Sequence, residues 1–322
     1  MPHSGIRSGL LAAFVLVSAV ACSGGGVSID HAKVVAIFGK DHVAAAPAAA
    51  PELVALGKEL YHDQRLSTKG NISCASCHDL ARFGTDGQAT SPGTDGVRGD
   101  RNSPPSVNAF RQFAQFWDGR AKDVEEQAQG PVLNPIEHGF ATAADFEAKL
   151  ASLPGMTERF AGLFPGEKPV SLANFGKAVG AFERTLVTKS RFDEYLDGRQ
   201  DALTDAEKQG LSTFMSSGCT ACHSGRTLGG GMFQKLGLVR PYPTEDPGRA
   251  KVTGNPAEQQ FFKVPMLLNV AETGPWFHDG KVATLEEAVR LMGSHQLGKD
   301  LAKTEVDSIV VFLRALSGKL AN

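Results

Sequence analysis

Residues 74–78 read CASCH and residues 219–223 read CTACH, so the chain carries the same five-residue pattern twice. A Cys-x-x-Cys pair followed at once by His is the attachment sequence of a c-type haem. Each thiol bonds one vinyl group of the porphyrin, and the adjacent imidazole ligates the iron. The pattern therefore predicts two covalently bound haem c groups. Their ligating residues are Cys74, Cys77 and His78 for the first, and Cys219, Cys222 and His223 for the second.

Two other interpretations of paired cysteines account for less of the pattern. The two pairs of a zinc ribbon are typically about 15–20 residues apart, whereas Cys77 and Cys219 lie in different halves of this chain. A disulfide within either pair is compatible with an oxidising compartment. It does not explain a histidine after both pairs, because only 9 of the 322 residues are histidine.

The N-terminus has the features of an export signal. Arg7 precedes an apolar run over 10–20 that is too short for a stable membrane span, and small residues precede Cys22. We expect residues 1–21 to be removed as a signal peptide and residues 22–48 to form a flexible linker. Two alternatives stay open: a free periplasmic protein, or a periplasmic protein anchored to the membrane by a lipid on Cys22.

The composition excludes nucleic acid as a partner and favours a helical fold. A hydrophobic fraction of 42% supports a packed core, and a net charge of -2 provides no basic excess for nucleic acid. An aromatic fraction of 7% is low for a large β sandwich, while 36 glycines and 17 prolines indicate long loops. A chain of 322 residues is long enough for two domains.

Helical patterns recur along the chain. Apolar residues follow helical spacing over 51–60, 172–186 and 306–316. Capping boxes that start at Thr204 and Thr284 predict two more helices.

These helices form two similar units, each with one Cys pair. We predict an N-terminal haem domain over 49–200 and a C-terminal haem domain over 201–322, whose last helix can pack back on the first domain. The Gly- and Pro-rich segment 84–105 predicts a long loop, and loops of that length usually carry function or surround a cofactor. The predicted fold is mainly α, with two cytochrome c-like haem domains and long irregular loops.

Further motifs occur in a fixed order between Leu56 and Gly318. They are LGKELY at 56–61, RNSP at 101–104, FWDGR at 116–120, QAQGP at 127–131, NPIE at 134–137, KVP at 263–265, LNV at 268–270, FHDG at 277–280 and LMG at 291–293. In content and order they resemble the bacterial di-haem cytochrome c peroxidase family, whose relatives include the tryptophylquinone-forming di-haem oxidases. The resemblance implies an enzyme that reduces hydrogen peroxide with electrons from a small donor protein, a cytochrome c or a cupredoxin.

The resemblance also implies a role for each haem. The N-terminal haem, with His78 as its proximal ligand, would be the peroxide site, and the C-terminal haem on His223 would accept the electrons. Met292 occupies the family's position for the second axial ligand of the C-terminal haem. A His/Met iron has a raised potential, which suits an electron acceptor.

The resemblance implies three further catalytic residues and a cation site. Glu137 would move a proton between the two peroxide oxygens, Gln127 would hold the peroxide, and Trp117 would relay electrons between the haems. A calcium ion at the domain interface would be held by oxygen atoms of three residues, Asn102, Thr273 and Pro275. Members of the family are often homodimers.

One loop departs from the family pattern. Many members have a histidine before the Arg-Asn motif that blocks the peroxide haem until the other haem is reduced. Here Thr94 occupies that position, and residues 91–99 contain no histidine. We therefore expect an open peroxide haem in the oxidised protein, while His138 has no assigned role.

Three functions compete. The first is a peroxidase. The second is an oxidase that modifies a partner protein; the missing histidine favours it, but Met292 disfavours it because the quinone-forming type has a tyrosine there. The third is a non-catalytic electron-transfer cytochrome, which would need neither Gln127 nor Glu137. We predict a cytochrome c peroxidase.

Overall fold

The computed structural model describes residues 1–2, 27–44 and 47–320. Cys22 and nearly all of the predicted signal peptide lie outside these residues, so the expectations for them stay predictions. In the part of the chain that the structure describes, no helix is both long and apolar enough to cross a membrane.

The fold is mainly α, as the sequence predicts, and its short strands form two antiparallel pairs. The helices are α1 (His31–Phe38), α2 (Pro51–His62), α3 (Cys74–Cys77), α4 (Val124–Gln127), α5 (Gln129–Leu133), α6 (Ala143–Ala151), α7 (Met156–Leu163), α8 (Leu172–Glu183), α9 (Arg191–Leu196), α10 (Asp205–Ser217), α11 (Ala250–Thr253), α12 (Leu285–Leu297) and α13 (Lys303–Arg314). The strands are β1 (Thr188–Ser190), β2 (Phe233–Lys235), β3 (Phe261–Lys263) and β4 (Gly318–Leu320).

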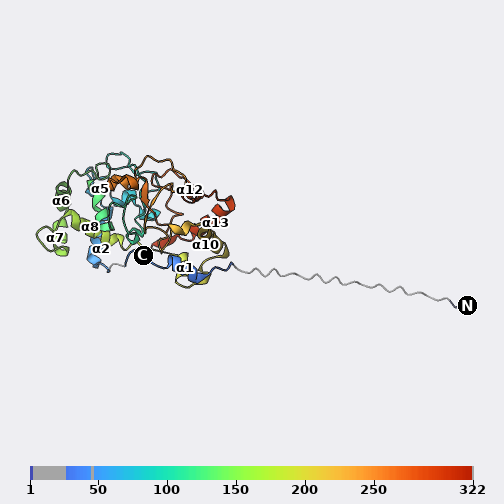
Figure 1. The fold of residues 1–322 in the computed structure, drawn as a ribbon. Coiled ribbons are helices and arrows are strands. Elements are labelled where there is room, and N and C mark those ends of the chain that lie inside the picture. Colours follow the sequence, from blue (N-terminus) through green and yellow to red (C-terminus); the bar gives the residue numbers. More distant parts are fainter. Residues whose placement is uncertain (3–26, 45–46, 321–322) are drawn as a thin grey trace.

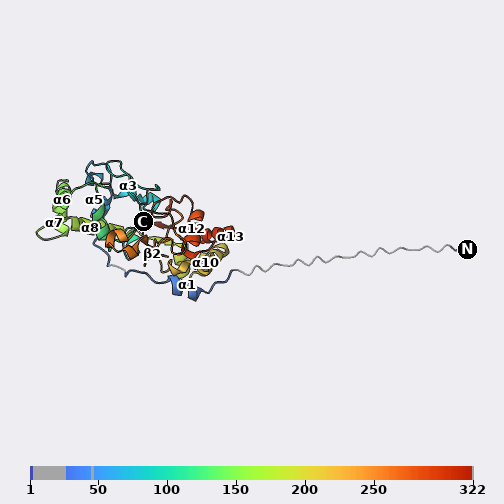
Figure 2. The same cartoon turned by 45° about the horizontal axis from the view of Figure 1, so that its top comes forward.

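Two hydrophobic cores organise the molecule (Figure 1). In the N-terminal core α2 packs directly on α8, and a Cβ at Gly57 would meet the carbonyl oxygen of Ala178 at 1.8 Å. In the C-terminal core α10 packs on α13, where a Cβ at Gly210 would meet the oxygen of Ser308 at 2.1 Å. Glycine at each crossing therefore lets two helix backbones approach closely. Figure 2 shows the same separation of α6–α8 from α10, α12 and α13 in a second view.

The prediction of a flexible linker over 22–48 is wrong for α1. Asp30 caps this helix, and Val34 and Phe38 are fully buried in the C-terminal core. The His31 side chain also donates a hydrogen bond of 2.8 Å to the carbonyl of Tyr195. Burial of these apolar side chains in the core stabilises α1. The Gly- and Ala-rich composition of the surrounding segment does not indicate this burial.

The boundary between the two cores lies earlier in the chain than the predicted domain boundary at residue 200. Helix α9 packs into the C-terminal core through Phe192 and Tyr195, so the change from one core to the other falls near β1. Helix α13 also belongs to the C-terminal core rather than to the first domain. Of the described residues after α13, those of β4 reach back, because β4 pairs with β1 and its Leu320 contacts the N-terminal core.

Candidate haem sites

The first Cys-His motif forms a single helical turn that ends in a fixed histidine. Helix α3 begins with a capping box between Ser73 and Ser76, and His78 follows as its C-cap. The Nδ1 of His78 donates to the carbonyl of Gly84 at 3.1 Å, and the Tyr61 hydroxyl donates to the carbonyl of His78 at 2.6 Å. With Nδ1 engaged, Nε2 is the free ligand atom, as in haem-ligating histidines.

The second motif repeats this arrangement. Helix α10 ends at Gly218, where a φ of 104° requires glycine, and a short turn over Cys219–Ala221 follows. The Nδ1 of His223 donates to the carbonyl of Leu228 at 2.9 Å. Burial lowers the pKa of both His78 and His223, so each imidazole is held in the neutral form that binds iron.

The cysteines of both motifs are half-buried thiols. Among the described residues none of the four forms a disulfide, and no cluster of three or more His, Cys, Asp or Glu side chains could hold a metal ion. Burial raises the pKa of Cys77 to about 11 and that of Cys219 to about 11, so neither is a free thiolate at neutral pH.

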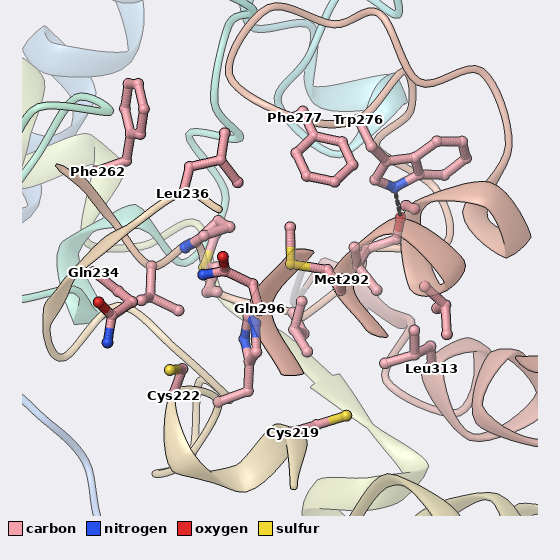
Figure 3. Close-up of a pocket in the computed structure, with 18 of the residues that line it drawn as sticks. Cys219, Cys222, Gln234, Leu236, Phe262, Trp276, Phe277, Met292, Gln296 and Leu313 are labelled. Carbon is pink, nitrogen blue, oxygen red and sulfur yellow. Dashed lines mark hydrogen bonds between the residues drawn. The ribbon is translucent and has the colours of Figure 1, made fainter. Parts of the chain in front are cut away.

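A large apolar cavity lies above the second motif, and it is lined by Cys219, Cys222, His223 and Met292. Figure 3 shows Met292 extending from α12 into the centre of this cavity, with the two cysteines along one wall. Imidazole, thioether and two thiols in an apolar cavity are the donor set of a c-type haem with His/Met ligation. The residues present therefore fit the haem that the sequence predicts.

The same cavity extends to residues predicted to lie between the haems. Asn102, Trp117, Thr273 and Pro275 also line it. The three predicted calcium ligands are thereby brought to one cavity, although they come from distant parts of the chain. The Asn102 Nδ2 donates to the carbonyl of Gln88 at 2.9 Å, so its Oδ1 is the atom left for a cation.

Arg101 connects the loop after the first haem motif to the second half of the chain. Its guanidinium pairs with Asp118 at 2.6 Å and with Asp246 at 2.7 Å. Asp118 also pairs with Arg120 at 3.0 Å. Two acidic residues around one largely buried guanidinium hold the segment of Trp117 against the C-terminal domain, and the sequence motifs did not reveal this pairing.

Glu137 lies outside the large cavity, in the loop that follows α5. Its Oε1 accepts a hydrogen bond of 2.7 Å from the Asn134 amide. Burial raises the pKa of Glu137, and the charge of Arg120 only partly opposes this effect. A carboxyl group with a raised pKa holds a proton more readily than an exposed glutamate, which suits a group that accepts and returns one. Gln127 ends α4, and its half-buried side chain forms no hydrogen bond with the described residues.

Thr94 is buried and fully engaged in hydrogen bonds. Its N–H donates to the carbonyl of Glu137 at 2.8 Å, and its hydroxyl donates to Asn71 Oδ1 at 2.7 Å. The Asn71 amide donates back to the carbonyl of Thr94 at 2.9 Å. The His138 side chain is buried, and its Nδ1 donates to the carbonyl of Leu66 at 2.6 Å.

Two covalent haem-attachment motifs on a mainly α fold with two cores define a di-haem cytochrome c. A family model described as di-haem cytochrome c peroxidase matches residues 51–201. The cytochrome c551 peroxidase of Nitrosomonas europaea is 46% identical over 270 residues, which cover 83% of this chain and 80% of the relative. The chain belongs to the di-haem cytochrome c peroxidase family.

Two further similarities extend to the related oxidases. The methylamine utilization protein MauG of Methylophilus methylotrophus is 32% identical, with 83% of each chain covered. A crystal structure of a MauG-like protein associated with microbial copper homeostasis superposes with a TM-score of 0.75 at 29% identity. That match covers 87% of this chain and 93% of the other.

Proposed function

We propose that this protein is a di-haem peroxidase that reduces hydrogen peroxide to two molecules of water. Two electrons come from a small periplasmic donor, a cytochrome c or a cupredoxin, and two protons come from solvent. The observation that carries the proposal is Met292, which shares one cavity with His223 as a His/Met electron-acceptor site requires. The 46% identity to a cytochrome c551 peroxidase over most of both chains supports the same activity.

The haems, when bound, supply the redox chemistry, and the chain's own residues handle the proton. Glu137 takes the proton from one peroxide oxygen and returns it to the other. The amide of Asn134 holds this carboxyl in place through a hydrogen bond of 2.7 Å. Gln127 binds the peroxide or a water molecule, and Trp117 relays electrons between the haem sites.

A calcium ion and the cellular location belong to the same proposal. Asn102, Thr273 and Pro275 line the same cavity, and their side-chain and carbonyl oxygens suit a hard cation. The protein would act in the periplasm as a homodimer, either free or anchored through Cys22.

A protein-modifying oxidase is the second candidate. It is favoured by residues 91–99, which carry no histidine and in which Thr94 is fixed away from any ligating role. It is disfavoured by Met292, which stands where the quinone-forming relatives have a tyrosine.

The test is peroxide turnover by the purified protein with reduced cytochrome c as the donor. The proposal expects the cytochrome to be oxidised in a two-to-one ratio with peroxide, and the haem stain after denaturing electrophoresis to be positive. Replacing Cys74 and Cys77 with Ala should leave one covalent haem and abolish turnover. A protein without covalent haem, or one that oxidises a partner's side chains but not the cytochrome, would contradict the proposal.

A further inference from the structure

Lys263 is a buried cation without an anionic partner. Its side chain lies at the end of β3 and is only 4% exposed. The ammonium donates to Gln112 Oε1, a neutral acceptor that is itself 4% exposed. Burial, with no neighbouring carboxylate to oppose it, lowers the pKa of Lys263 to about 7. A buried charge normally requires an opposite charge, because a single neutral hydrogen bond does not replace its hydration.

The position of Lys263 shows where that opposite charge belongs. Among the described residues that line the large cavity, Lys263 is the only lysine, and there is no arginine, aspartate or glutamate. It shares this cavity with Cys222, His223 and Met292, the residues proposed to hold the C-terminal haem. Figure 3 shows Cys222 and Met292 at this cavity. The chain therefore places one cation and no anion around a cofactor that brings two propionate carboxylates of its own.

The surrounding backbone holds Lys263 in place. Its N–H donates to the carbonyl of Trp117 at 2.7 Å, and Lys263 pairs with Phe233 of β2. His278 lines the same cavity, and its buried Nδ1 has no hydrogen-bond partner among the described residues. The uncompensated ammonium of Lys263, fixed beside Trp117, indicates that this part of the cavity receives an anionic group.

We infer that Lys263 binds a propionate carboxylate of the C-terminal haem and supplies the fixed positive charge that favours reduction of that haem. The inference rests on the proposed function, in which electrons enter at this haem. Reduction adds one negative charge at the iron, so a nearby ammonium in a low-dielectric cavity stabilises the reduced state. Lys263 would thus be a positioning residue that acts through the haem and does not touch peroxide.

The experiment compares Lys263→Met with Lys263→Arg in the holoenzyme, by spectroelectrochemical titration of each haem. Lys263→Met keeps the length of the side chain and removes its charge. We expect at least a tenfold fall in the equilibrium constant for reduction of the C-terminal haem, about 59 mV for one electron. Lys263→Arg should retain most of the wild-type potential. Lys303→Met, at a side chain that is 86% exposed, is the matched control and should change neither haem.

An unchanged C-terminal potential in haem-loaded Lys263→Met would overturn the inference. A shift confined to the N-terminal haem would also overturn it, because the propionate would then belong to the other cofactor. If Lys263→Met does not accumulate, Lys263→Gln provides the same neutral comparison. Redox-induced infrared difference spectra add a readout that peroxide turnover does not affect, since loss of the ammonium should shift a propionate band. If Lys263→Met shows the expected fall in potential but the wild-type protein does not turn over peroxide, the result would count against the proposed function alone.

Discussion

The indole Nε1 of Trp117 donates a hydrogen bond of 2.8 Å to the main-chain carbonyl of Asn102. Asn102 is also the residue whose side-chain Oδ1 is left for a cation, because its amide donates to the carbonyl of Gln88. The proposed electron relay, Trp117, is therefore hydrogen-bonded directly to a ligand of the proposed calcium site. Any change in the cation site should reach Trp117 through a single hydrogen bond.

Removal of calcium should accordingly slow electron transfer between the haems. A chelator would free Asn102 and loosen the wall that carries Thr273 and Pro275. Stopped-flow reduction of the N-terminal haem by way of the C-terminal haem measures the effect, and added calcium should restore the rate. Full transfer rates in excess chelator would remove these three residues from the functional set.

Met292→Ala should abolish the weak near-infrared band that arises from sulfur-to-iron charge transfer. The potential of the C-terminal haem should fall, because the thioether ligand raises it. Met266 lines the same cavity, and Met266→Ala is the control that should keep the band. Persistence of the band in Met292→Ala would show that another group ligates the iron.

Glu137→Gln should slow O–O cleavage by roughly 10²–10⁴-fold, the range typical of losing a general acid–base. Because burial raises the pKa of Glu137, the proton-accepting carboxylate is lost at a higher pH than for an exposed glutamate. The rate should therefore decline as pH falls through this raised pKa, and Glu137→Gln should lack that decline. Glu158→Gln, at an exposed site on α7, is the control. Identical pH profiles for wild type and Glu137→Gln would exclude the role.

The oxidised protein should show a high-spin N-terminal haem in its electron paramagnetic resonance spectrum. The Thr94 hydroxyl is held by Asn71 at 2.7 Å and is in any case a poor ligand for ferric haem. Peroxide should react without prior reduction, and Thr94→His should convert the signal to low spin and slow that reaction. Two low-spin signals in the wild type would refute the prediction. His138→Gln would then test whether His138 leaves its hydrogen bond with Leu66 to ligate the iron.

The free energy of unfolding should fall as pH rises, because of Glu183 on α8. Burial, aided by the charge of Glu125, raises the pKa of Glu183 to about 8. Between the unfolded pKa of about 4.3 and this value, the folded state holds a proton that the unfolded state has released. The free energy of unfolding should fall across that window by up to about 1.4 kcal/mol per pH unit, with no further loss above it. Unfolding of Glu183→Gln at several pH values should show a flatter profile, and an unchanged slope would contradict the assignment.

Much of the fold follows from local patterns. Thr204 and Thr284 cap α10 and α12 as predicted, since a cap depends on residues only three positions apart, although the complete capping box forms only at Thr204 among these two. Helix α1 was not predicted, because its eight residues become a stable helix only by packing into the C-terminal core. The predicted domain boundary at residue 200 likewise lies too late in the chain, since the cores change near β1. The apolar side of α9 does not indicate which core the helix joins.

The sequence by itself determined the covalent chemistry of this protein. A thiol pair and a histidine within five residues attach a haem wherever the chain folds, because that chemistry depends on covalent spacing alone. Only the tertiary structure decided which distant residues share one cavity, and it brought Asn102, Lys263 and Met292 together there. It also decided that Lys263 is buried without a carboxylate beside it. Burial and charge pairing result from packing between segments far apart in the chain, and no local pattern encodes them.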